Sequence, residues 1–138
     1  MHNAAQGDRV SDIRIKRVYD PPTPDDGIRV LVDRLWPRGL RKSDVHMDYW
    51  LKEVAPSPEL RRWFSHDPAH WAEFQISYRQ ELSQGCSELS QLSALAGKER
   101  LTLLYAAHNP HCNHALVLQD FLRETVVDKG QLRKDKKS

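Results

Sequence analysis

Residues 101–118 constrain the fold of this chain more than any other stretch. They begin with a mostly apolar run, LTLLYAA, which is typical of a buried strand. The chain then breaks at Asn109-Pro110, and an apolar helical pattern begins near Asn113, a residue type that caps helix N-termini. In α/β proteins, ligands bind where a buried strand leads through a loop into a helix. The stretch therefore predicts an α/β element with a candidate site on its loop.

Two further strands are predicted near the N-terminus. Ile13, Ile15 and Tyr19 mark a strand over residues 12–19. The consecutive apolar residues 30–32 indicate a second strand over residues 28–35 that is buried on both faces. The two strands could form a hairpin, but the proline-rich loop between them is long for one.

Helix signals fill the region between the second strand and residue 101, although residues 40–56 show no clear pattern. Proline in the first helical turn after a capping residue predicts a helix start, and glycine predicts a helix end. These signals predict a helix starting at Ser57-Pro58, one from Asp67-Pro68 to about residue 83, one over residues 89–96, and a last one from Asn113 to about residue 124.

The order of these elements predicts the fold class. A crossover through helices favours parallel pairing of the strands that it joins. We expect an α/β fold with a small, mainly parallel sheet flanked by helices in a single three-layer-like domain. In this scheme residues 1–11 are a flexible arm, residues 12–126 the domain, and residues 127–138 a basic disordered tail.

Composition excludes several classes of protein. At 138 residues the chain has the length of one domain, and no apolar run approaches the roughly 20 residues that span a membrane. No secretory signal is visible at the N-terminus. Cys86 and Cys112 cannot form a disulfide framework, so a reducing cytoplasm is the expected location.

The net charge of +2 is unevenly distributed. The last ten residues carry +4, so the rest of the chain carries −2, which argues against a basic nucleic-acid-binding domain. The basic residues of the tail are Lys129, Arg133, Lys134, Lys136 and Lys137. The tail could contact nucleic acid weakly and without sequence preference. Whether the protein forms a homodimer is left open.

The loop after the second strand carries a candidate anion site. Parallel pairing would bring it close to the loop that precedes Asn113. Arg34 and Arg38 could hold a carboxylate or phosphate, and Trp36 between them could stack on a flat ligand. In the alternative, Trp36 fills the core and both arginines pair with acids such as Asp33 or Glu53.

The loop from residue 105 to 114 supplies the other half of the predicted site. The helix start at Asn113 offers unpaired backbone N–H groups to an anion, although Asn113 could merely cap the helix while His114 packs. We assign acid–base roles to His114 or His108, a hydroxyl donor role to Tyr105, and ligand contact to Asn109.

Two other chemistries are possible on this loop. His108, His111 and His114 are zinc or copper ligand types, but their spacing matches no familiar pattern, so no metal site is assigned. Cys112 could be a nucleophile with a neighbouring histidine as its base. His66 and His70 are expected to be surface residues. No cofactor is indicated.

Five blocks of the sequence together resemble the YeaO-like branch of bacterial domain-of-unknown-function family 488. The resemblance spans about residues 12–124 and implies a compact α/β fold without an established activity. The blocks are KRVYD (16–20), GIRVLVDRLWPRG (27–39), EVAPS (53–57), LLYAA (103–107) and NHALVL (113–118).

More distant branches of that family carry a motif that this chain has largely lost. The motif reads Cys-Ala-Glu, five residues, then Cys-His-Arg. Of its cysteines, glutamate, histidine and arginine, only the histidine is retained, as His114, so the resemblance does not imply thiol chemistry here. The cysteines fall on Tyr105 and Asn113, the glutamate on Ala107 and the arginine on Ala115.

The preferred interpretation is a pocket for a small anionic or nucleotide-like ligand at the carboxyl ends of the strands, in a protein that could be an enzyme using one histidine. The alternative is a non-enzymatic binding or stress-response accessory protein, with nucleic acid on the tail or metal on the three histidines.

Overall fold

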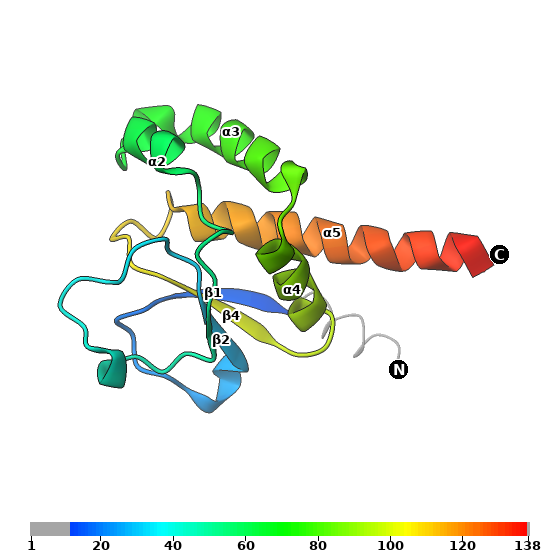
Figure 1. Cartoon of the computed structure of the whole chain (residues 1–138), viewed down its shortest axis with the longest axis horizontal. Coiled ribbons are helices and arrows are strands. Elements are labelled where there is room, and N and C mark those ends of the chain that lie inside the picture. The colour runs from blue at the N-terminus through cyan, green and yellow to red at the C-terminus, as the bar shows by residue number, and fades with distance from the viewer. Residues whose placement is uncertain (1–11, 138) are drawn as a thin grey trace.

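A parallel four-stranded sheet organises the molecule, as a computed structural model of the chain shows (Figure 1). The structure describes residues 12–137, with side chains in the last helix as far as Thr125. The strand order is β1-β4-β2-β3, and every neighbouring pair is parallel. The strands are β1 (Ile13–Arg17), β2 (Ile28–Leu31), β3 (Tyr49–Trp50) and β4 (Leu101–Tyr105).

The predicted α/β class and parallel pairing are confirmed. Because β4 lies between β1 and β2, the first two strands do not form a hairpin. Ile13 of β1 and Ile28 of β2 both pair with Leu101. The carboxyl ends of all three strands therefore meet at one edge of the sheet.

The predicted helix starts are also confirmed. The Ser57 hydroxyl accepts a hydrogen bond from Leu60 N–H, and the Asn113 side chain accepts one from Leu116 N–H. The last helix was expected to end near residue 124 but continues to residue 137. The helices are α2 (Pro58–Phe64), α3 (Trp71–Gln84), α4 (Ser87–Ala96) and α5 (His114–Lys137), with 3-10 turns η1 (Pro24–Asp26), η2 (Lys42–Asp44) and η3 (Pro68–His70).

The two faces of the sheet are covered differently (Figure 1). Val30, Val32 and Leu103 belong to the main core, which also contains buried residues of α3, α4 and α5. Leu31 and Leu104, which alternate with them, pack in a second cluster beneath the irregular segment between β2 and β3. The third layer is therefore formed by residues 36–48 of this segment and not by a layer of helices.

The strands end earlier than predicted, and the end of β2 shows why. Val32 N–H still bonds to Leu104 O. One residue later, the Asp33 side chain takes the place of a backbone partner and accepts the Ala106 N–H at 3.0 Å. This side-chain bond ends the ladder and turns the chain outward at the carboxyl edge.

Three expectations depend partly on residues that the structure leaves undescribed. The arm over residues 1–11 lies outside the described residues. The backbone of the basic tail belongs to α5 as far as residue 137, but its side chains are not described, so its nucleic-acid contact stays a prediction. The homodimer is still left open. No helix in residues 12–137 is long and apolar enough to cross a membrane.

Candidate functional site

A cavity of about 600 Å³ opens at the carboxyl edge of the sheet. One wall is the loop after β2, including Asp33, Arg34 and Arg38. The second is the β4–α5 loop with His108, together with His114 at the start of α5, and the third is α2 with the turn that follows it. The structure thus brings together the two loops that the sequence predicted to converge.

The cavity carries an excess of positive charge. Its charged side chains are Arg34, Arg38 and Arg61 against the single carboxylate of Asp33. Three histidines, at positions 66, 108 and 114, add further hydrogen-bonding groups. The excess favours an anionic ligand.

Asp33 and His114 form a largely buried pair on the cavity floor. His114 Nε2 donates to Val32 O at 2.9 Å and lies 3.3 Å from Asp33 Oδ1. The same Asp33 oxygen is buried without a hydrogen-bond partner among the described residues. Burial raises the pKa of Asp33, although His114, the Ala106 N–H and Arg61 oppose the rise. Since His114 is the first residue of α5 and Val32 follows β2, the hydrogen bond between them joins the start of α5 to the end of β2.

Arg34 and Arg38 differ in their freedom to contact a ligand. Arg34 donates to the carbonyls of Ala55 and Pro56, both at 3.3 Å, and so holds the chain before α2 against the β2 loop. The Arg38 side chain is exposed and has no hydrogen bond to a described residue, while its carbonyl accepts the Tyr19 hydroxyl at 2.9 Å. Neither arginine forms an ion pair with a described acid, so the alternative of pairing with Asp33 or Glu53 is not observed.

Trp36 combines the two interpretations offered for it. Its Nε1 donates to Leu40 O at 2.6 Å, and its ring packs edge-on against Trp50 with 5.2 Å between centroids. It is partly buried and packs against the second core cluster. Part of the same side chain lines the cavity, so Trp36 is a rigid wall.

The two asparagines build the β4–α5 loop. Asn109 Oδ1 accepts the His111 N–H at 2.8 Å, and Asn113 Nδ2 donates to Asn109 O at 2.9 Å. Asn113 Oδ1 caps α5. Both residues line the cavity, but these polar atoms are engaged within the protein, so the capping interpretation of Asn113 is the one observed.

His108 and Tyr105 take different positions on β4 and its loop. His108 is exposed at the cavity, with its Nδ1 3.5 Å from Arg17 Nη2. Tyr105 is buried in the main core and is not part of the cavity wall. Burial raises the pKa of its hydroxyl. The geometry does not support direct contact between Tyr105 and a ligand.

The loop shows no arrangement suited to a metal or a nucleophile. Among the described residues, no three His, Cys, Asp or Glu side chains gather as a potential metal site. His111 is exposed and does not line the cavity. Cys112 is half-buried and packs against the main core.

Two basic side chains of the cavity escaped the sequence analysis. Arg61 comes from α2, and His66, expected to be a plain surface residue, comes from the turn after it; both line the cavity. The only local signal was the renewed helix start at Asp67-Pro68, which implies a tight turn just before it. Nothing in the sequence indicated that this turn lies over the sheet edge.

The fold and the site define a class: an α/β protein with an arginine-lined cavity at the carboxyl edge of a parallel sheet. The chain belongs to the family described as "Inactive DUF488-N3 subclade", whose model matches residues 12–138. This agrees with the expected membership in the YeaO-like branch.

Curated relatives support the same membership. The chain is 51% identical over 112 residues to the "Uncharacterized protein YeaO" of Escherichia coli (strain K12), which covers 81% of this chain and 97% of the relative. It is 43% identical over 114 residues to the "Uncharacterized protein Rv3073c" of Mycobacterium tuberculosis. This match covers 83% of this chain and 96% of the relative. A Mycobacterium bovis relative, Mb3100c, matches to the same extent. No solved structure matches the chain.

Proposed function

We propose that this protein binds a small organic anion of nucleotide-like size in the cavity at the sheet edge and does not chemically transform it. The observation that carries the proposal is the charge of the cavity, three arginines against one carboxylate. Arginine is suited to carboxylate and phosphate groups because its planar guanidinium donates two parallel hydrogen bonds.

The size and lining of the cavity support an organic ligand over a bare inorganic ion. A volume of about 600 Å³ lies within the roughly 300–1,000 Å³ of small-molecule sites. Phe64, Phe74 and Trp36 contribute apolar wall in addition to the charged groups. A ligand with a charged head and a flat or apolar body matches both parts.

The state of the polar groups favours binding over turnover. His114 Nε2 donates its hydrogen to Val32 O, and one Asp33 oxygen accepts the Ala106 N–H. Both groups are therefore already hydrogen-bonded within the protein. At the two positions that carry cysteine in the distant branches, this chain has Tyr105, which is buried in the core, and Asn113, which caps α5. The description of the family as an inactive subclade is in keeping with this.

Isothermal titration calorimetry with matched probes tests the proposal. AMP, phenyl phosphate and benzenesulfonate carry the anion, whereas adenosine and phenol are their uncharged counterparts. We expect at least one anionic probe to bind and its counterpart not to. Arg38→Ala should weaken that binding about tenfold, since hydrogen bonds to charged groups contribute about 1.5–3 kcal/mol.

Arg41→Ala is the matched control, because Arg41 is exposed, pairs with Asp44 and lies outside the cavity. The proposal is wrong if no anionic probe binds, or if the uncharged counterparts bind equally well.

One observation favours a second function, acid–base catalysis by His114. Its Nε2 lies 3.3 Å from a carboxylate oxygen of Asp33, as in a histidine–carboxylate pair. Mass spectrometry of AMP and phenyl phosphate after prolonged incubation decides between the two. Conversion that disappears in His114→Gln would establish catalysis, and full recovery of both probes would support binding alone.

A further inference from the structure

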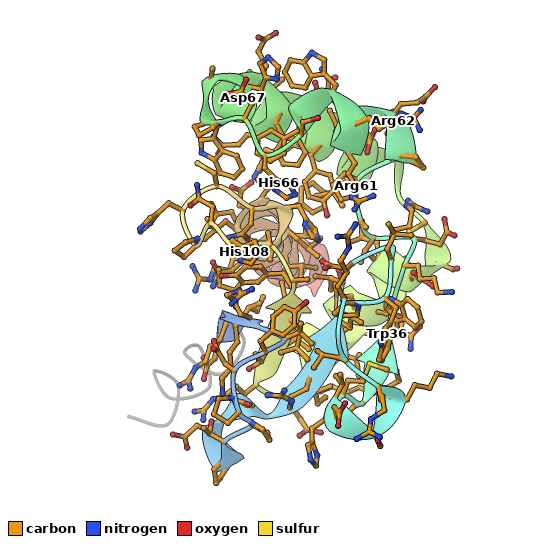
Figure 2. The ribbon with its side chains drawn as sticks, turned by 90° about the vertical axis from the view of Figure 1, so that its left-hand side faces the viewer. Trp36, Arg61, Arg62, His66, Asp67 and His108 are labelled. Carbon is orange, nitrogen blue, oxygen red and sulfur yellow. The ribbon has the colours of Figure 1, made fainter. Side chains whose placement is uncertain are left out.

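Helix α2 and the turn that follows it each present one unassigned side chain to the cavity, Arg61 and His66. Figure 2 shows Arg61 and His66 on the side of α2 and its turn that faces the loop carrying His108. Arg62 and Asp67, from the same elements, lie farther from that loop and do not line the cavity. Helix α2 and its turn therefore direct one side chain each toward the site.

The backbone of this turn is strained where His66 enters the cavity. Ser65 and His66 have φ values of 45° and 58°, a left-handed conformation that side chains disfavour. Bonds on both sides hold it, from Ser65 N–H to Arg61 O at 3.0 Å and from Asp67 N–H to Phe64 O at 2.8 Å. Glycine would adopt these angles at lower cost. Strain of this kind is concentrated at functional sites.

The basic side chains of the cavity differ in the hydrogen-bond donors that they can offer a ligand. Arg34 and His114 donate to carbonyls of the protein itself. In the described part of the chain, the side chains of Arg61, His66 and Arg38 have no hydrogen-bond partner. These three therefore have donors available for an incoming group.

The charge of the cavity indicates how many negative charges that group carries. With the histidines counted as neutral, three arginines and one aspartate give the cavity a net charge of +2. A singly charged anion would neutralise only half of it. A phosphate monoester carries close to two negative charges above a second pKa of about 6 and offers three acceptor oxygens. Three separate donors, from two arginines and a histidine, match these oxygens.

We infer that Arg61 and His66 are specificity-determining residues and that the site selects the dianion of a phosphate monoester, held between them and Arg38. This inference rests on the proposed function. It adds the class of ligand and a wall of the site that neither the sequence nor the family indicates.

The test compares phenyl phosphate with benzenesulfonate, which shares its ring and tetrahedral head but carries one charge. At pH 7.0 we expect the wild-type protein to bind phenyl phosphate at least tenfold more tightly. Arg61→Ala and His66→Ala should each weaken phenyl phosphate binding about tenfold and benzenesulfonate binding much less. Arg62→Ala, the neighbouring arginine outside the cavity, should change neither.

His66→Gly separates ligand contact from a purely structural role. Glycine relieves the left-handed strain, so the melting temperature should stay the same or rise. Affinity for phenyl phosphate should nevertheless fall about tenfold, as in His66→Ala. Unchanged affinity in His66→Gly, or an unchanged ratio between the two probes in Arg61→Ala, would overturn the inference.

The outcomes also separate this inference from the proposed function. If the wild-type protein binds benzenesulfonate as tightly as phenyl phosphate, the dianion selectivity is wrong but anion binding stands. If it binds none of the anionic probes, both fall.

Discussion

Asp26 is the residue whose substitution should most clearly expose the electrostatics of this fold. It lies at the amino edge of the sheet, opposite the cavity, and is buried. Its carboxylate accepts hydrogen bonds from Thr23 N–H at 3.1 Å and Thr23 Oγ1 at 2.8 Å. Two cations complete the cluster, Lys16 Nζ at 3.1 Å and the Arg29 guanidinium.

Asp26→Asn retains the shape of the side chain but removes the charge. The side chain of Arg29 is 8% exposed, so it would keep a buried positive charge without its counterion. Removing one partner of a buried ion pair costs about 3–5 kcal/mol. Lys16 is more exposed, and water can replace part of its interaction. We expect Asp26→Asn to lower the free energy of unfolding by about 3 kcal/mol at pH 7.

Urea denaturation followed by far-ultraviolet circular dichroism measures this loss. Asp25→Asn is the matched control, since Asp25 is the adjacent acid, is exposed, and contributes only its carbonyl to described contacts. Its effect should stay within about 0.5 kcal/mol. A loss below about 1 kcal/mol in Asp26→Asn would show that Arg29 finds compensation elsewhere.

The pH dependence provides an independent check. Burial alone would raise the pKa of Asp26, but the hydrogen bonds from Thr23, Lys16 and Arg29 hold it well below the ordinary value of 3.8. The stabilisation is therefore fully present above that value and is lost as the pH falls below it. The difference in the free energy of unfolding between wild type and Asp26→Asn should therefore become smaller as the pH is lowered from 5 to 2. A constant gap would refute the electrostatic explanation.

Two further substitutions test packing and the site. Gly27→Ala should cost about 2–4 kcal/mol in urea denaturation, because φ is 65° and the new Cβ would lie 2.4 Å from Arg100 O. Gly39→Ala, at φ 80° with open space around it, should cost only about 1 kcal/mol, and equal losses would contradict the steric argument. Asp33→Asn removes the carboxylate of the cavity while its amide oxygen can still accept the Ala106 N–H. It should tighten phenyl phosphate binding severalfold by calorimetry; weaker binding would mean that Asp33 contacts the ligand favourably.

The sequence by itself determined the local elements of this protein. Ser57, Asp67-Pro68 and Asn113 predicted helix starts because capping is an interaction among residues within one turn of each other. The buried strand over residues 101–106 followed from its apolar run. The order of strands and helices predicted the α/β class. The resemblance to a family implied the same class but no contacts within the site.

Only the tertiary structure decided the sheet order and the use of each site residue. The insertion of β4 between β1 and β2, and the bond between Asp33 and Ala106, join residues that are 70 or more positions apart. Sequence patterns do not report such non-local energies. For the same reason Arg34 was not predicted to bind carbonyls at residues 55 and 56, and Arg61 and His66 were not predicted to face the β4–α5 loop.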